Sequence, residues 1–173
     1  MTRYIAWFVV AVATFAAAGS VHAQPTERLY ITAFAINMGT IGPGSSASVD
    51  MTIDEWSTAE ERERLITIML EKGPDALLKA LQKESVKGRF RIPGLRGPDP
   101  HHLRLGLDLR YAWQVPLPEG GRRIVVITDR YIGFQEARAQ PRTMDYPFTL
   151  IEMRVNKDGE GEGKMSVATK IAF

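Results

Sequence analysis

The sequence predicts an α+β fold in which a mainly antiparallel sheet of about seven strands carries one helical hairpin after its second strand. Most of the chain after residue 28 alternates apolar and polar residues, with the period of two that is typical of strands. Between residues 57 and 84 the period changes to that of helices. The pattern contains no strand–helix–strand repeat that would require a parallel sheet. The sheet is therefore expected to be a partial barrel or a curved sheet, with a β-sandwich as the alternative.

The strands are predicted from runs of alternation that end at turn residues. A glycine-rich loop separates the first two strands, and a loop rich in proline and glycine precedes the fourth. The last two strands are joined by residues 156–163 as a hairpin. The predicted strands cover residues 29–38, 47–54, 86–92, 103–115, 122–128, 149–155 and 164–173.

Two short helices are predicted between the second and third strands. Ser57 and Glu60 have the spacing of a capping box, which indicates a helix over residues 58–72 that ends at Gly73. A proline at the first position opens a second helix over about residues 74–84. Each helix has a single apolar stripe, so the pair is expected to cover the apolar face of the sheet or one end of a partial barrel.

The longest predicted strand has the clearest pattern in the sequence. From Leu103 to Val115, apolar residues alternate without interruption against polar or small residues. This pattern predicts one buried face and one solvated face along the whole strand.

Residues 1–23 are predicted to be a secretory signal. A positive charge at Arg3 precedes an apolar run, and small residues precede the expected cleavage site after Ala23. The remaining chain, residues 24–173, would be a single domain of about 150 residues without cysteine. A chain without cysteine has no disulfide and no thiol for a lipid anchor. We expect a periplasmic or secreted protein that does not span a membrane once the signal is removed.

The overall charge argues against nucleic-acid binding, because 22 basic residues nearly balance 20 acidic ones. The charges are nevertheless segregated, with an acidic stretch over residues 50–63 and a basic one over 87–110. Strand alternation would place five basic side chains on one exposed face: Lys87, Arg89, Arg91, Arg104 and Arg110. Such a face predicts an anionic partner, or alternatively ion pairs with the acidic stretch of the same chain.

The irregular stretch 129–146 is the second candidate site, because long loops within a small domain are often functional. Aromatic residues alternate there with carboxylates and guanidinium groups, which can build a pocket. The alternative is that the aromatic side chains fix the loop to the core. The predicted ligand-binding residues are Tyr131, Phe134, Glu136, Arg138, Arg142, Tyr146 and Trp113.

The same loop also allows a hydrolase, with Asp129, Glu136 and Asp145 as carboxylates and Arg138 or Arg142 beside them. No metal or other cofactor is expected. His101 and His102 are adjacent at the start of a strand, where their side chains would point to opposite faces.

Residues 128–134, 145–154 and 159–166 resemble segments of small exported bacterial proteins of uncharacterised function. The resemblance covers most of the chain after Ile31. It implies export and a single domain, and it implies no activity, cofactor or site residue.

Together these observations predict an exported, non-enzymatic binding protein that holds a small apolar or amphipathic ligand between the sheet and the helical hairpin. The alternatives are an interaction module that presents the basic face to an anionic partner, and the hydrolase.

Overall fold

The computed structural model describes residues 27–36, 46–93, 106–130 and 148–167. Within these ranges the chain forms one seven-stranded antiparallel sheet and a helical hairpin between the second and third strands. The elements are β1 (Leu29–Ile36), β2 (Ser46–Ile53), α1 (Ala59–Lys72), α2 (Pro74–Leu81), β3 (Gly88–Arg91), β4 (Leu107–Pro116), β5 (Arg122–Thr128), β6 (Thr149–Val155) and β7 (Gly161–Val167).

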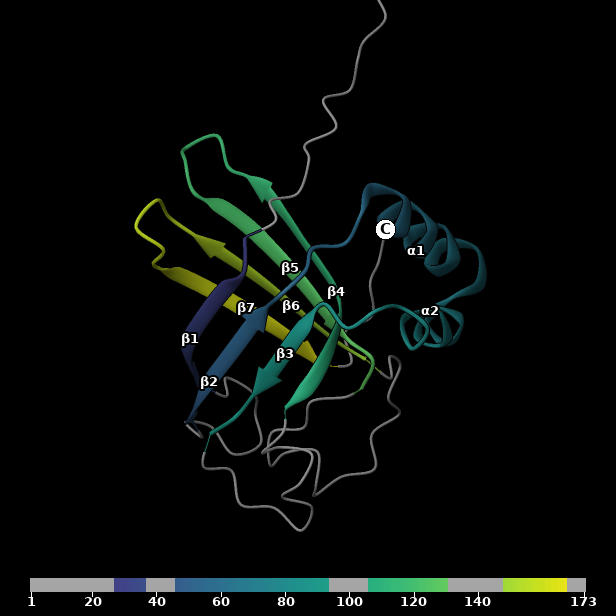
Figure 1. Cartoon of the computed structure of the whole chain (residues 1–173), viewed down its shortest axis with the longest axis horizontal. Helices are drawn as coiled ribbons and strands as arrows, with labels where there is room; N and C mark the ends of the chain where they lie inside the picture. The colour runs from purple at the N-terminus through teal and green to yellow at the C-terminus, as the bar shows by residue number, and fades with distance from the viewer. Residues whose placement is uncertain (1–26, 37–45, 94–105, 131–147, 168–173) are drawn as a thin grey trace, which may run out of the picture.

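The strands follow one another in the sheet in chain order, and each pairs with its sequence neighbour. Figure 1 shows the sheet curled into a half-barrel, with both helices on one side of it. The predicted α+β class, the partial barrel and the position of the hairpin are therefore confirmed. Since all seven strands belong to one sheet, the β-sandwich alternative is wrong.

The inner face of the curled sheet holds the main core. Side chains from β2 to β6 form it together with Trp56 and with Ile92, which follows β3, and none is more than 8% exposed. Its members are Val49, Met51, Ile53, Trp56, Phe90, Ile92, Leu109, Ala112, Ile124, Val126, Ile151 and Met153. Strand alternation predicts the burial of the core residues of β2, β3 and β6 directly, because every second residue of these strands is apolar.

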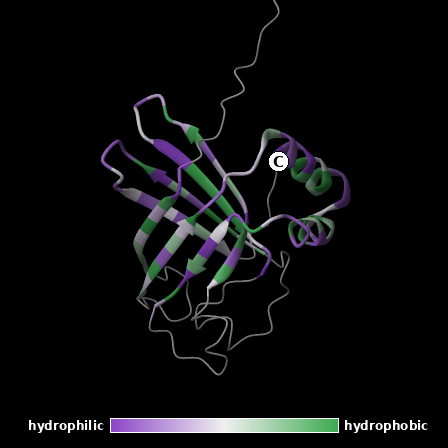
Figure 2. Cartoon of the chain, viewed as in Figure 1, coloured by the Kyte–Doolittle hydropathy of each residue, from purple (hydrophilic) through white to green (hydrophobic). Residues whose placement is uncertain are grey.

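A second core lies between the helices and the outer face of the sheet. Leu65, Leu77 and Leu81 of the hairpin pack with Tyr111 and Phe148. Strand β5 therefore contributes to both cores, and its middle is a continuous hydrophobic stretch, green in Figure 2. The hairpin covers a sheet face, as predicted, but that face is the outer one.

Strand β4 changes faces at a β-bulge. The register of its pairing with β5 shifts between Leu109 and Tyr111, so Arg110 is the extra residue. Before the bulge Leu109 lies in the inner core, and after it Ala112 does, while Tyr111 joins the second core. The prediction of a single buried face along this strand is therefore wrong. Because the helices cover the outer face here, Tyr111 on the outer face of β4 and Ala112 on the inner face are both buried.

Helix α1 begins one residue later than predicted. Thr58 is the N-cap: its Oγ1 accepts from the Glu61 N–H at 3.1 Å, and its own N–H donates to Glu61 Oε2 at 2.9 Å. The predicted capping residue, Ser57, is buried and bonds to β4 instead. Strand β3 pairs with β4 only as far as Leu109, so Ser57 supplies hydrogen bonds to β4 beyond that point.

The last hairpin is tighter than predicted. Strand β7 begins at Gly161, and Asn156 Oδ1 closes the turn by accepting from the N–H groups of Asp158 and Glu160 at 2.9 Å each. A side chain at Gly161 would lie within 1.9 Å of the Arg154 carbonyl oxygen, so glycine is required there for the close approach of β6. In the described part of the chain, neither helix is long and apolar enough to cross a membrane.

Candidate functional site

Strand β1 forms one edge of the described sheet. It pairs with β2 along its full eight residues, from Leu29 opposite Ile53 to Ile36 opposite Ser46, without a bulge. Among the described strands, none pairs with its other side. We call that side, with the side chains of Tyr30, Phe34 and Ile36, the β1 edge; it lies at the margin of the sheet in Figure 1.

The β1 edge exposes large apolar side chains. Tyr30, Phe34 and Ile36 are 68%, 67% and 59% exposed. All three occupy even-numbered positions of the strand, and since successive side chains of a strand point to opposite faces, all three lie on its outer face. Ala33 faces inward and is also exposed, which leaves the middle of the strand accessible from both faces.

Contacts on the β2 side hold β1 in place. Leu29, Ile31 and Ala35 pack against the inner core. At the start of the strand, Arg28 Nε lies 2.6 Å from Asp54 Oδ1. Arg28 also donates to the Tyr30 hydroxyl at 3.3 Å, and this hydrogen bond, followed by the Asp54 charge, raises the pKa of Arg28. The strand is thus fixed by packing and pairing that leave its outer side chains free of the core.

The two edges of the described sheet differ in chemistry. Strand β7 carries Glu162 between Gly161 and Gly163, and Lys164 follows directly; charges and glycines are common means of preventing a strand edge from pairing with another chain. Strand β1 has the sequence Leu-Tyr-Ile-Thr-Ala-Phe-Ala-Ile, with no charge, proline or glycine. Such an edge is chemically suited to accept a further strand.

The space that the sequence analysis assigned to a ligand contains packed side chains. Leu65, Leu77 and Leu81 meet the sheet there. Trp113, a predicted ligand-binding residue, packs against the same core and lies with its ring centroid 5.4 Å from the guanidinium carbon of Arg62. Burial raises the pKa of the neighbouring Tyr111 to about 12. The six other predicted ligand-binding residues, Tyr131, Phe134, Glu136, Arg138, Arg142 and Tyr146, lie outside the described residues.

Lys87 does not lie on an exposed basic face. Its side chain is 1% exposed, and Nζ donates to Glu55 Oε1 at 2.7 Å and to Glu61 Oε1 at 3.2 Å. The predicted exposure is wrong because Lys87 precedes β3 and its ammonium group reaches the acidic segment at the start of α1. For Lys87 the structure thus agrees with the alternative prediction, in which the basic stretch forms ion pairs with the acidic stretch of the same chain.

Arg110 is also removed from the predicted face. As the bulge residue it is half-buried, with Nε 2.8 Å from Asp129 Oδ2 and Nη1 donating to the Glu84 carbonyl at 3.0 Å. The hydrolase candidate Asp129 is thus ion-paired, whereas Glu136 and Asp145 lie outside the described residues.

Of the predicted basic residues that the structure describes, Arg89 and Arg91 are exposed. They lie on the outer side of β3, where Arg91 is opposite Asp50 and Arg89 Nε is 3.9 Å from Asp108 Oδ1. Arg104 falls outside the described residues. An acidic side chain therefore lies beside each of these two arginines.

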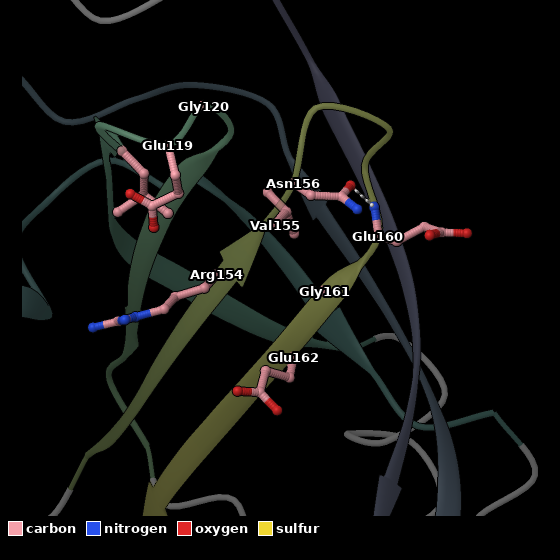
Figure 3. Close-up of a pocket in the computed structure, with 9 residues that line it drawn as sticks. Glu119, Gly120, Arg154, Val155, Asn156, Glu160, Gly161 and Glu162 are labelled. Carbon is pink, nitrogen blue, oxygen red and sulfur yellow. Dashed lines mark hydrogen bonds between the residues drawn. The ribbon is translucent and has the colours of Figure 1, made fainter.

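An open depression of about 550 Å³ lies between the β4–β5 and β6–β7 turns, a feature that the sequence analysis missed. Glu119, Arg154, Glu160 and Glu162 are among its lining residues, and Figure 3 shows the carboxylate of Glu160 pointing away from the other three. The side chain of Asn156 is engaged in closing its own turn. In the described part of the chain, no three His, Asp or Glu side chains are placed to hold a metal ion.

No protein-family model, curated protein or solved structure matches the chain. The site therefore depends on the residues of the chain itself, and among them the β1 edge combines accessibility with a side that none of the described strands pairs with. Sequence reasoning identified the strand but did not single it out as a site. The signal was present as eight successive uncharged residues, but alternation alone does not show which strand lies at an edge.

Proposed function

We propose that this chain is an exported, non-enzymatic binding protein that takes an extended segment of a partner protein onto the β1 edge. One observation carries the proposal: Tyr30, Phe34 and Ile36 are exposed along a regular edge strand that has no charge, proline or glycine. The predicted signal over residues 1–23 supports export.

In this mode of recognition, an added strand receives its affinity from main-chain hydrogen bonds and its specificity from alternate side chains. Tyr30 and Phe34 lie on the outer face of β1, so they would contact those residues of the added strand that also point to the outer face, which are every second residue. Arg28 stands at the start of β1, paired with Asp54. The chemistry therefore favours a partner segment that is extended, uncharged over about eight residues, and aromatic or β-branched at alternate positions.

The proposal is tested by selecting binders from a displayed library of random linear peptides about ten residues long, enough to span β1. The selected peptides should be uncharged and alternate in pattern. Phe34→Lys places a charge on the edge and should weaken their binding by about tenfold or more.

The matched control is Leu70→Lys, a similar exchange on the exposed side of α1. It should leave peptide binding unchanged. Peptides that bind the parent protein and the Phe34→Lys variant equally well would place the binding surface elsewhere and contradict the proposal.

A further inference from the structure

Resting on the proposed function, we infer that the strand added to the β1 edge is β1 of a second copy of this chain, antiparallel and centred on Thr32. The result would be a two-fold dimer whose sheet continues from one copy into the other. The inference follows from the sequence of β1, its register with β2 and its exposure.

Symmetry limits how two β1 strands can pair. Directly opposed residues of antiparallel strands lie on the same face of the sheet. In a two-fold dimer, the outer faces of both copies lie on the same side of the joined sheet only when one residue is paired with the same residue of the other copy. The two-fold axis then passes between these two identical residues. Since β1 covers residues 29–36, an axis at Thr32 or at Ala33 gives the longest overlap, seven residues in either case.

The axis at Thr32 gives the more favourable side-chain pairs. It places Tyr30 of each copy opposite Phe34 of the other on the outer face, with the two Thr32 side chains between these pairs. Aromatic pairs and threonine pairs are both favourable across antiparallel strands. An axis at Ala33 would oppose Phe34 with Thr32 and would form no aromatic pair.

The charges near the edge permit this approach. No residue of β1 is charged, so no like charges are directly opposed within the overlap. The nearest acidic side chain on the outer face is Asp50 of β2, which stands opposite Thr32. Across the dimer the two Asp50 residues would be three strand spacings apart, about 14 Å, which exceeds the screening length at physiological salt.

The first test is the oligomeric state of the purified protein by light scattering coupled to gel filtration. We expect a dimer for the parent protein and for the control Leu70→Lys, and a monomer for Phe34→Lys. Circular dichroism should show that both variants remain folded, because both side chains are exposed. A parent protein that stays monomeric at its highest soluble concentration would overturn the inference.

The second test uses the absence of cysteine from the chain, which makes a single introduced thiol unambiguous. Thr32→Cys should form a disulfide-linked dimer on mild oxidation, because the two substituted positions would face each other across the axis. Thr52→Cys lies one strand further from the edge and should stay monomeric. If Ala33→Cys cross-links faster than Thr32→Cys, the register centred on Thr32 is wrong.

The two proposals can fail separately. If selected peptides bind the edge while the parent protein is monomeric and Thr32→Cys does not cross-link, the second copy is excluded and the strand-binding function stands. If the peptides also bind independently of Phe34, both proposals are wrong.

Discussion

Ser57 and Ala112 exchange two hydrogen bonds across a distance of 55 residues in the chain. The Ser57 N–H donates to the Ala112 carbonyl at 2.8 Å, and the Ala112 N–H donates to Ser57 Oγ at 3.2 Å. Both residues are buried. This pair joins the segment before α1 to β4 just after its bulge, and so fixes where the helical hairpin leaves the sheet.

Replacing Ser57 with alanine should therefore destabilise the protein by about 1–3 kcal/mol, because it leaves the buried Ala112 N–H without its acceptor. Urea unfolding followed by circular dichroism measures the change. Ser48→Ala, at an exposed position of β2, is the control and should change stability by less than about 0.5 kcal/mol. Equal effects of the two substitutions would show that the Ser57 hydroxyl contributes little.

Lys87 should make stability depend on alkaline pH. Burial lowers its pKa, but hydrogen bonds from its ammonium group to Glu55 and Glu61 outweigh burial, and the net pKa is raised. Because the lysine pKa is higher in the folded than in the unfolded state, the charged lysine stabilises the folded protein, and this contribution is fully present below the unfolded pKa of about 10.4. The contribution is lost as the pH rises through the folded-state pKa. Urea unfolding at increasing pH should show this fall.

The variant Lys87→Met tests the origin of that pH dependence. It should be less stable than the parent at neutral pH by about 3 kcal/mol or less, since it removes one partner of a buried ion pair whose glutamates reach solvent. Its stability should also fall less steeply above the unfolded lysine pKa. A parallel decline in both proteins would assign the alkaline loss to other groups.

Packing of the hairpin on the sheet should depend on Leu81, which is fully buried in the second core. Leu81→Ala should cost about 2–5 kcal/mol in unfolding free energy, because it removes apolar contacts and leaves a cavity. Leu70→Ala, on the exposed side of α1, should cost less than about 1 kcal/mol. Similar losses at both positions would contradict the assignment of these helix faces.

Export is tested by the N-terminus of the protein recovered from a bacterial host that expresses the full sequence. Mass spectrometry should show a chain that begins at Gln24 in the periplasm or the medium. A chain found only in the cytoplasm with Arg3 still present would contradict the predicted signal.

Much of the fold could be predicted because strand and helix periods are local properties of the sequence. Alternation located the described strands, and the change of period located the hairpin between β2 and β3. The capping residue was misplaced by one position, since both Ser57 and Thr58 can cap a helix and only tertiary contact with Ala112 decides between them.

The candidate site could be predicted less well, because it depends on which residues meet in space. One extra residue at Arg110 reverses the faces of β4, and an uninterrupted alternating pattern does not reveal it. Lys87 occupies a position that strand alternation assigns to solvent, yet the acidic groups beside α1 bury it. The importance of β1 depends on its place at the sheet edge, which the order of the strands establishes.

Amide hydrogen exchange along β1 tests the strand-addition account most directly. Amides that face β2 should be protected in both the parent protein and Phe34→Lys, because their partners are within the chain. At high protein concentration, the amides on the β1 edge should be protected in the parent protein and should exchange rapidly in Phe34→Lys. Edge amides that exchange equally fast in both proteins, at every concentration and with selected peptides present, would contradict the addition of a strand at this edge.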